Sequence, residues 1–388
     1  MRTIVVGGGI AGLYVAEQLA KRGDHVTLLE KDSRLGGRVL TSKLGFEIGA
    51  GRIATNHKLV LALIKRFGLK TYRLSEGSRW KGLGDALSQP NDFEKVWTPL
   101  VKLFESLTPA KHTLRELADR TIGPALTADI LSHYGYRAET EVLRADLAIK
   151  SFLGEMSEKA KFVGVVGGLS GLIKAMAEAC KAAGVAIQLD TDITAVHDGK
   201  VTAGDGSAWT ADRIVLALPV SALRKLPIMR KVKLLKHLKM EPLTRIYAKM
   251  ALPWCMKERL VTDSPLRFII PIIPELGLVM ISYTDAQDTK HFRGLTGASL
   301  VGALQLELVR LFPEEGLPVI LWAHAYEWTD ACTYWLPGSY DPVAESRLAL
   351  EPIPGTKIHL CNESFSLRQA WMEGALEHAT RLLAHLKP

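Results

Sequence analysis

The fold is decided near the start of the chain, where residues 3–12 read TIVVGGGIAG. The β-branched run predicts a strand, and the glycines after it fit the pattern GxGxxG. A helix should follow, because apolar residues recur with a period near 3.6, at Leu13, Ala16, Leu19 and Ala20. Gly23 should end that helix, and a second strand, residues 25–29, should lead into Glu30. This order of elements predicts an α/β fold with a parallel sheet.

Three glycines and one acidic residue of this stretch have separate tasks in a dinucleotide-binding turn. Gly7 would permit the tight turn, Gly9 would let the backbone approach a pyrophosphate, and Gly12 would let the helix pack closely on the strand. The helix N-terminus would offer N–H groups and a partial positive charge to the phosphates. Glu30 would accept a hydrogen bond from a ribose 2′-hydroxyl, and its charge argues against a 2′-phosphate such as that of NADP.

Length and charge narrow the class of protein. The 388 residues suit two intertwined domains, and a hydrophobic fraction of 47% is ordinary for a soluble enzyme. The densest basic stretch of this chain of net charge +8 is residues 224–239, RKLPIMRKVKLLKHLK. We expect it to form a solvated helix face whose apolar residues pack inward. A nucleic-acid or membrane patch is the alternative, but no aromatic interleaving supports it, so we expect no nucleic-acid partner.

The cysteines and the first strand indicate the compartment. The four cysteines form no CxxC pair, so we expect no metal site and no disulfide framework in Cys180, Cys255, Cys332 and Cys361. Lone thiols in a large chain are typical of a reducing compartment. The strand at residues 3–6 leaves no room for a signal peptide, and no stretch of about 20 apolar residues exists. We therefore expect a cytoplasmic protein without a membrane span.

The segment after Glu30 resembles a known family. Residues 31–38 read KDSRLGGR, and the run E-x7-G-R is similar to the signature of the FAD-dependent amine oxidases. This flavin monoamine oxidase family includes monoamine, polyamine and L-amino-acid oxidases. The resemblance implies that FAD is the cofactor, with Gly36 and Gly37 along its pyrophosphate and Arg38 beside the flavin.

Later segments extend the resemblance through the chain. They are VGGLSGL at 166–172, IQLDTDITAV at 187–196, DRIVLALP at 212–219, IHLCNES at 358–364 and AWMEGA at 370–375. The resemblance implies one strand over 187–196, with Ile193 against the adenine. It also implies that Glu363 binds FAD hydroxyls, that Trp371 faces the flavin, and that the Met372 N–H reaches the flavin pyrimidine edge. Asn362 replaces a glycine of the family pattern, which puts the local contacts in doubt.

Residues 45–69, GFEIGAGRIATNHKLVLALIKRFGL, look most like the L-amino-acid oxidases within this family. The resemblance places Gly51 beside the cofactor and gives Arg52 the role of holding the substrate carboxylate. A structural arginine paired with a backbone carbonyl or an FAD phosphate is the alternative. Residues 278–283 resemble the strand whose tyrosine, here Tyr283, helps to bind that carboxylate; core packing is the alternative for this side chain.

Two regions depart from the family pattern. Many members have a lysine that holds a water at flavin N5, and Arg245 stands one residue short of it. Lys249 would lie on the same face only if strand alternation continues from Arg245. The family's aromatic wall over the flavin corresponds to Cys332, Tyr334 or Tyr340, depending on where a gap is placed. For Cys332 we expect a buried, inert thiol and not a covalent bond to the flavin.

Together these features predict a two-domain flavoprotein. Residues 1–78, 151–225 and 350–388 should form a discontinuous FAD-binding domain, and 79–150 and 226–349 a substrate domain of helices and a mixed sheet. We expect hydride transfer from the Cα–H of an amine, foremost an L-amino acid, to flavin N5. The imine would then give an oxo product and ammonia, and dioxygen would give hydrogen peroxide. A polyamine or monoamine oxidase and a non-catalytic flavin-binding interaction protein remain alternatives, and a homodimer remains open.

Overall fold

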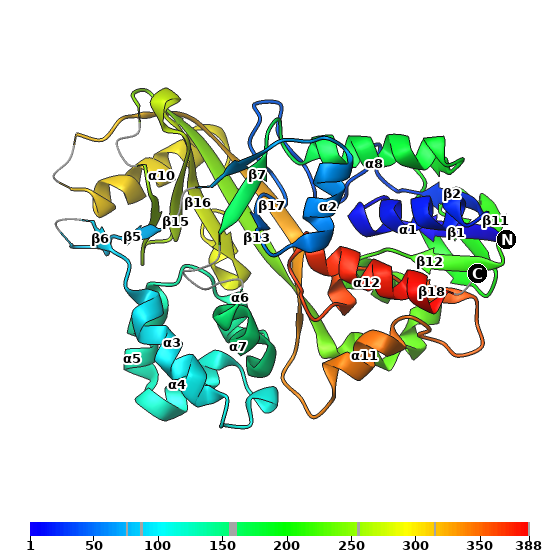
Figure 1. The fold of residues 1–388 in the computed structure, drawn as a ribbon. Helices are drawn as coiled ribbons and strands as arrows, with labels where there is room; N and C mark the ends of the chain where they lie inside the picture. The colour runs from blue at the N-terminus through cyan, green and yellow to red at the C-terminus, as the bar shows by residue number, and fades with distance from the viewer. Residues whose placement is uncertain (75–76, 86–87, 155–160, 254–256, 314–315, 387–388) are drawn as a thin grey trace. The chain divides into compact units, whose positions relative to one another are not determined.

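A computed structural model describes residues 1–74, 77–85, 88–154, 161–253, 257–313 and 316–386. Cys255 lies outside these residues. The chain divides into two compact units, each described here by itself (Figure 1). The first unit comprises Met1–Arg73, Phe162–Met240 and Tyr340–Pro388, and the second comprises Leu74–Lys161 and Glu241–Ser339.

A five-stranded parallel sheet forms the centre of the first unit. Its strands, in spatial order, are β18 (Ile358–Leu360), β12 (Arg213–Leu216), β1 (Arg2–Val6), β2 (His25–Leu29) and β8 (Ala186–Gln188). All four neighbouring pairs are parallel. The predicted strands at 3–6 and 25–29 are therefore confirmed, as is a parallel sheet in an α/β fold. Chain order reverses on either side of β1, and ligands of such sheets bind beyond the carboxyl ends of the strands at that point.

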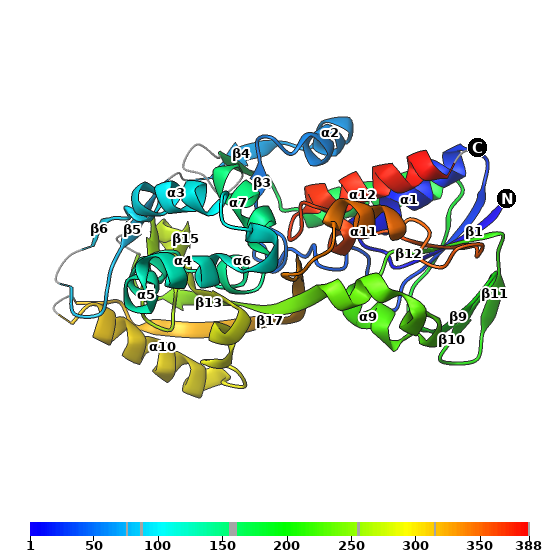
Figure 2. The same ribbon diagram turned by 90° about the horizontal axis from the view of Figure 1, so that it is seen from below.

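Helices cover one face of this sheet (Figures 1 and 2). They are α1 (Ile10–Lys21), α8 (Ser170–Ala182), α12 (Met372–His385) and, beside them, α2 (Lys58–Arg66). Their apolar sides share one core with the strands, in which Leu13, Leu28 and Leu376 are fully buried. Removing such side chains from water is the main stabilising contribution to the layer. α11 (Pro342–Leu348) and the short η6 (Glu363–Phe365) complete the C-terminal part of the unit.

Two small antiparallel sheets flank the parallel one. The first contains β9 (Ile193–His197), β10 (Lys200–Ala203) and β11 (Ala208–Thr210), and the second contains β3 (Ile53–Ala54), β7 (Phe162–Val165) and β4 (Thr71–Arg73). The single strand expected over 187–196 is wrong. β8 ends at Gln188, and Asp190 turns the chain with a φ of +52° before β9 begins in a different sheet.

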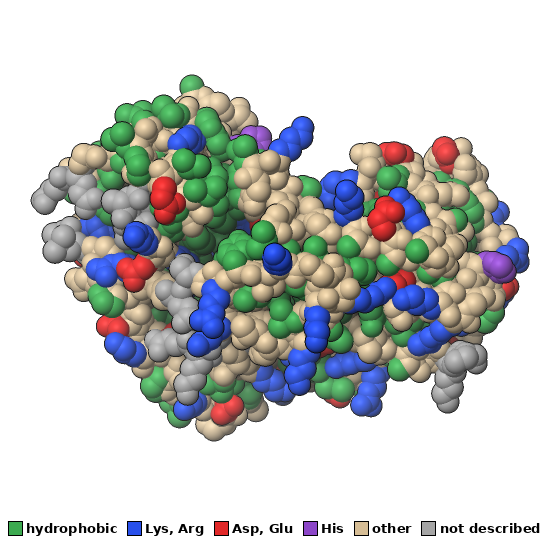
Figure 3. All heavy atoms as spheres, turned by 45° about the horizontal axis from the view of Figure 1, so that its top comes forward, with side chains coloured by type: hydrophobic (Ala, Val, Ile, Leu, Met, Phe, Trp, Pro, Cys, Tyr) green, Lys and Arg blue, Asp and Glu red, His purple; other side chains and the backbone are tan. Residues whose placement is uncertain are grey.

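The basic stretch 224–239 has the predicted burial but not the predicted helix. The stretch begins with the last residues of α9 (Val220–Lys225). After α9 it forms two 3₁₀ segments, η2 (Pro227–Lys231) and η3 (Lys233–His237). The apolar residues Met229, Leu234 and Leu235 are buried, while the basic side chains are exposed. Lys and Arg side chains are prominent on the face drawn in Figure 3.

A seven-stranded mixed sheet forms the second unit. Its order is β17 (Ile320–Trp335), β13 (Leu238–Met250), β16 (Leu278–Asp285), β15 (Phe268–Ile273), β14 (Arg259–Val261), β5 (Ser78–Trp80) and β6 (Gln89–Pro90). β5 and β14 run parallel, whereas β13, β16, β15 and β14 are joined antiparallel. α10 (Gly297–Leu311) packs on the sheet through Leu304 and Leu308, which are fully buried. The short segments η4 (Pro274–Leu276) and η5 (Ala286–Lys290) flank β16.

Helices supply the rest of the second unit. They are α3 (Phe93–Phe104), α4 (Leu114–Ile122), α5 (Pro124–Ser132), α6 (Ala138–Glu141) and α7 (Ala145–Leu153), with η1 (Pro109–Lys111) before α4. Ring contacts among Phe93, Trp97, Tyr134 and Phe152 fill the space between them. In the part of the chain that the structure describes, no helix combines the length and apolar character needed to cross a bilayer.

Candidate functional site

The protein's own backbone fills the space at two glycines of the first turn. Gly7 has a φ of +106°, and a Cβ there would lie 2.6 Å from the carbonyl oxygen of Ala217. A Cβ on Gly12 would lie 1.9 Å from the carbonyl oxygen of Gly7. α1 therefore starts in close contact with the end of β1, and only glycine permits it.

Gly9 is different, because nothing in the protein excludes a side chain there. Its φ of −74° is ordinary, and a Cβ would meet no heavy atom within 4 Å. Gly9 is the N-cap of α1, which has no side-chain cap hydrogen bond and no acidic residue in its first turn. The positive end of the helix therefore adjoins open space, which is the arrangement that binds phosphate.

Glu30 and the GGR segment line the same turn. The buried Glu30 carboxylate accepts N–H hydrogen bonds from Gly8 (2.6 Å) and Asp32 (3.0 Å). The Gly36 N–H donates to the Gly8 carbonyl at 2.8 Å, and Gly36 and Gly37 have positive φ angles of 108° and 54°. The sequence-predicted residues at 7–12, 30 and 36–37 thus come together around the start of α1.

Arg38 joins this turn to the C-terminal motif. Its guanidinium pairs with the buried Glu363 carboxylate at 2.7 Å and donates to Asn362 Oδ1 at 3.3 Å. Asn362 has an extended backbone with a φ of −169°, which does not require the glycine of the family pattern. Its side chain also accepts the Ser364 N–H at 2.9 Å. The replacement therefore adds contacts to this region instead of removing them.

Arg52 and Trp371 lie together, with a third residue that the sequence did not indicate. The Arg52 guanidinium lies 5.0 Å from the ring centroid of Phe162 and 5.8 Å from that of Trp371. The two rings stack at 6.0 Å and 11°. Arg52 follows Gly51 and directly precedes β3, which pairs with β7, and Phe162 is the first residue of β7. Arg52 is half-buried.

His57 contacts Trp371 in this group. It is fully buried, and its ring meets Trp371 edge-on with centroids 5.0 Å apart. Its Nδ1 accepts the Ala54 N–H at 3.3 Å, which assigns the ring hydrogen to Nε2. Burial lowers the pKa of His57 to about 4, so the ring is neutral at pH 7.

Two remaining cofactor candidates occupy the ends of elements. Ile193 is buried at the start of β9, and Met372 is buried as the first residue of α12, with Trp371 as its N-cap. Trp371 is preceded by Ala370, which has a φ of +65° where the family pattern has glycine. The aromatic side chain is therefore presented by a tight turn directly before the helix.

Arg245 and Tyr283 form a pair of their own in the second unit. They are opposite each other on β13 and β16, and Arg245 donates to the Tyr283 hydroxyl at 3.3 Å, with its guanidinium 4.8 Å from the ring. Burial opposes the charge of Arg245, but interactions with Tyr283 and Tyr247 outweigh it and raise the pKa of the guanidinium. Arg245 is therefore a permanent buried cation.

Lys249 lies on the same face of β13 as Arg245. The register shift between Ile246 and Tyr247 skips Ile281 of β16, and the alternate residues Ile246, Ala248 and Met250 all belong to one apolar core, so alternation along β13 continues past Arg245. The Lys249 ammonium donates to the Leu276 carbonyl.

The three candidates for the aromatic wall have different surroundings. Tyr334 is buried in the second unit, and burial raises its hydroxyl pKa well above the ordinary value. Cys332 is half-buried there and has no disulfide. Tyr340, in the first unit, stacks on His237 at 3.9 Å. In the first unit, burial raises the pKa of the Cys180 thiol to about 12 and also raises that of Cys361, so both are inert.

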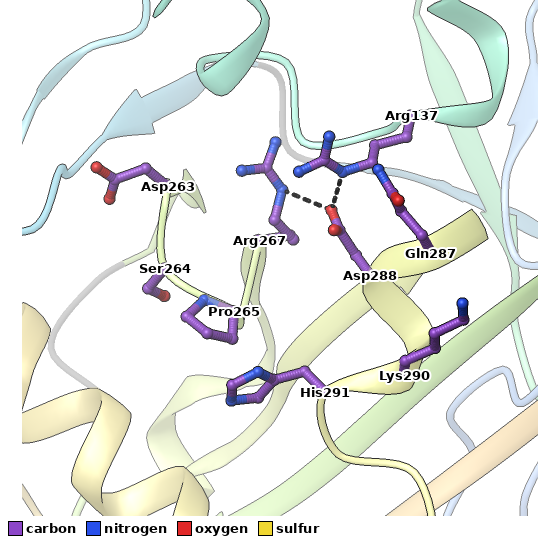
Figure 4. Close-up of a pocket in the computed structure, with 9 residues that line it drawn as sticks. All are labelled: Arg137, Asp263, Ser264, Pro265, Arg267, Gln287, Asp288, Lys290 and His291. Carbon is purple, nitrogen blue, oxygen red and sulfur yellow. Dashed lines mark hydrogen bonds and ion pairs between the residues drawn. The ribbon is translucent and has the colours of Figure 1, made fainter. Parts of the chain in front are cut away.

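A cavity of about 390 Å³ opens in the second unit, and none of the predicted site residues lines it (Figure 4). Arg137 and Arg267 both point to Asp288 in its wall, at 2.7 and 3.4 Å. The acid neutralises these two arginines in part.

Sequence patterns did not indicate two residues of the Arg52 group, His57 and Phe162. His57 lies inside the quoted stretch 45–69, but that stretch does not reveal its contact with Trp371. Phe162 belongs to no motif, and only the β3–β7 pairing brings it to Arg52.

Comparison with known proteins follows this geometry. A family model described as "Flavin containing amine oxidoreductase" matches residues 10–382. The chain belongs to this family. It is therefore a flavin oxidoreductase acting on CH–NH₂ groups, and its cofactor is FAD.

Relatives of this amine oxidoreductase include L-amino-acid oxidases. A Bacillus subtilis (strain 168) protein with the printed name "Putative L-amino-acid oxidase YobN" is 23% identical over 461 residues, covering 98% of this chain and 93% of that protein. The L-amino-acid oxidase of Mus musculus is 24% identical over 457 residues, covering 98% and 70%. The flavin-containing amine oxidase A of Equus caballus is 32% identical over 106 residues, covering 26% and 20%.

Proposed function

We propose that this amine oxidoreductase oxidises L-amino acids and that Arg52 binds the substrate carboxylate. The observation that carries the proposal is the half-buried Arg52 guanidinium beside the Trp371 and Phe162 rings. Two relatives that each cover 98% of the chain support it, one with the printed name "Putative L-amino-acid oxidase YobN" and the other "L-amino-acid oxidase". Bound FAD would supply the two-electron oxidation of the substrate Cα–NH₂ group to an imine. Hydrolysis of the imine would give a 2-oxo acid and ammonia. Dioxygen would take up the two electrons and become hydrogen peroxide.

The cofactor would lie against the turn at the start of α1. The proposed contacts are Gly7, Gly9, Gly12, Glu30, Gly36, Gly37, Arg38, Gly51, Ile193, Glu363 and Met372. Open space at Gly9 and the uncapped N-terminus of α1 suit a pyrophosphate. Glu30 keeps lone pairs for a ribose hydroxyl in addition to its two backbone bonds. The first unit would thus be the FAD-binding domain, and the second the substrate-binding domain.

Arg52 suits a carboxylate because its planar guanidinium can pair with both oxygens at once. The rings of Phe162 and Trp371 lie within cation–π distance of the guanidinium and would help to keep it in place. Aromatic surroundings also favour the neutral amine over the ammonium ion, and only the neutral amine can lose a hydride from Cα.

Arg245 and Tyr283 would act together as a hydrogen-bonded pair. The Tyr283 oxygen accepts from Arg245, so its own hydrogen remains to be donated to a substrate oxygen. Arg245 keeps the positive charge of the family's lysine but cannot give up a proton. We therefore expect slower reoxidation by dioxygen than a lysine would support.

The proposal is tested with the purified flavoprotein and a substrate panel. Anaerobic bleaching of the flavin should occur with L-amino acids and be at least about tenfold slower with their decarboxylated amines and with polyamines. D-amino acids serve as the matched control and should not bleach it. Peroxide formation in air should follow the same order. Preference for amines or polyamines would replace the proposal with a monoamine or polyamine oxidase, and no bleaching by any of them would favour a non-catalytic flavoprotein.

A further inference from the structure

One carboxylate ties together the two segments that carry Arg52 and Trp371. Glu373, in the first turn of α12, is buried, and its Oε1 accepts the Leu59 N–H at 2.8 Å. Its Oε2 accepts the N–H groups of Leu59 and Val60 at 3.1 and 2.9 Å. These N–H groups belong to the first turn of α2, where they have no acceptor within the helix.

The cap of α2 therefore comes from another helix. His57, the N-cap residue, makes no side-chain cap hydrogen bond to α2. The negative charge of Glu373 lies at the positive end of the α2 dipole, where it is most stabilising. Both carboxylate oxygens are used, so the first turns of α2 and α12 are held in one relative position.

His57 makes the second link between the same segments. Its Nδ1 binds the N–H of Ala54, at the end of β3, and its ring edge contacts Trp371. Arg52 lies immediately before β3, and Trp371 lies two residues before Glu373. The backbone on each side of the Arg52–Trp371 contact is thus fixed at two points.

We propose that Glu373 and His57 are positioning residues that set Arg52 against Trp371 for recognition of a carboxylate. Neither residue is assigned a contact with substrate. The inference rests on the proposed function, because it assumes that Arg52 binds the substrate carboxylate. It makes a separate claim, namely that carboxylate recognition depends on the charge of Glu373.

The decisive pair of variants is Glu373→Gln and Glu373→Asp. Glutamine keeps the size but has one acceptor oxygen, and its NH₂ group would face the N–H groups of α2. Aspartate keeps the charge and both oxygens. Glu377→Gln is the matched control, because Glu377 lies one turn along α12 and pairs with Arg368 instead.

The first readout is binding of benzoate, a carboxylate without an amine, to the oxidised flavoprotein, followed by the flavin spectrum. Glu373→Gln should weaken benzoate binding and raise the KM for an L-amino acid by about tenfold, which corresponds to one charged hydrogen bond. The KM for the decarboxylated amine should change less than about threefold. Aspartate should restore most of the benzoate affinity, and Glu377→Gln should match the wild type.

The second readout is the melting temperature and flavin content of the same variants. If Glu373 is only a helix cap, Glu373→Gln lowers both and affects benzoate, amino acid and amine equally, which overturns the proposal. Should Glu373→Gln not fold, His57→Gln tests the other link, and unchanged benzoate affinity in that variant contradicts the proposal.

Arg52→Ala separates this inference from the proposed function. If positioning acts through Arg52, adding Glu373→Gln to Arg52→Ala should weaken benzoate binding no further. A selective loss in Arg52→Ala without one in Glu373→Gln leaves the proposed function standing and removes the positioning role. If Arg52→Ala loses amino acid and amine equally, the proposed function fails, and the positioning proposal fails with it.

Discussion

Arg52 and Arg245 both rest against aromatic rings, yet their surroundings differ in one respect. Arg245 is 8% exposed, lies in the middle of a long strand and donates to the Tyr283 hydroxyl on the strand opposite. Arg52 is half-buried beside Phe162 and Trp371, and it directly precedes the two-residue strand β3. The enclosed Arg245 should contribute to the stability of the sheet in addition to its proposed role, whereas the less buried Arg52 should contribute mainly to ligand recognition.

The same contrast separates Gly12 from Gly9. At Gly12 the protein fills the place of a side chain with the Gly7 carbonyl, and at Gly9 it leaves that place empty. Filled positions should matter for folding, and open positions should matter for binding. Pairs of variants at matched positions can separate these two effects.

The largest effect is expected at the glycine pair. Gly12→Ala should destabilise the protein by about 3 kcal/mol or more, because its Cβ would overlap a backbone oxygen. Gly9→Val should leave the unfolding free energy of the flavin-free protein within about 1 kcal/mol of wild type, since its backbone is extended and unhindered. Its FAD content should nevertheless fall severely. Urea unfolding and the flavin-to-protein absorbance ratio measure the two effects.

A Gly9→Val protein that unfolds as readily as Gly12→Ala would show that Gly9 is also structural. A Gly9→Val protein with full flavin would show that the cofactor does not approach this turn.

The arginine pair comes next. Arg245→Ala should lower the unfolding free energy by about 2–5 kcal/mol, because it leaves a cavity and removes the donor to Tyr283. Arg52→Ala should cost less than about 1 kcal/mol, since its side chain is partly solvated. Urea unfolding in excess FAD keeps cofactor loss from entering the comparison. Equal destabilisation by the two variants would remove the distinction between them.

Buried ionisable groups in the two units should respond to pH in opposite directions. His57 keeps its neutral form down to about pH 4, whereas an unfolded histidine takes up a proton near pH 6.5. The unfolding free energy should therefore fall as the pH is lowered from about 6.5 to about 4, by up to about 1.4 kcal/mol per pH unit. Burial raises the pKa of Asp285 to about 6, so its folded form binds the proton first and contributes stability as pH falls from 6.

His57→Gln should therefore flatten the loss of stability between pH 6.5 and 4, and Asp285→Asn should steepen it. Urea titrations at half-unit pH steps measure both slopes. Parallel curves for wild type and His57→Gln would contradict the burial argument.

The smallest effect is expected at Ala370, whose φ of +65° is unfavourable for a residue with a Cβ. Ala370→Gly relieves that strain but gives the unfolded chain more freedom, so the net gain should be about 0.5–1 kcal/mol. Ala384→Gly, at an exposed position of α12, should instead lower stability, because glycine is a weak helix former. Thermal unfolding compares the two, and a loss of stability in Ala370→Gly would contradict the strain.

The parallel sheet and first turn could be predicted because their determinants are local. The β-branched run at residues 3–6, the 3.6-residue period of the apolar residues after Gly12 and the glycine spacing together predict a strand, a helix and a second strand from residues 3–30 alone. The break between β8 and β9 could not be predicted because it depends on Asp190 adopting a positive φ, and the short polar run Asp190–Asp192 does not reveal that. Residues 224–239 predict an α-helix and not two 3₁₀ segments, because apolar residues recur at similar intervals in an α-helix and in a 3₁₀ helix.

The Arg52 group could be predicted only in part. Motif resemblance indicated Arg52 and Trp371, but their contact with Phe162 and their links to His57 and Glu373 arise from strand pairing and helix packing between distant segments. The pairing of Arg245 with Tyr283 is likewise a property of two strands together.

The most direct test of the account is anaerobic flavin bleaching in Arg52→Ala, with an L-amino acid and its decarboxylated amine. Loss of a charge-assisted, partly desolvated contact should cost about 2–5 kcal/mol with the amino acid. Bleaching by the amine should change little or improve, and the flavin-to-protein ratio should stay near wild type. Equal loss with both substrates, or loss of the flavin itself, would contradict the claim that Arg52 recognises the carboxylate.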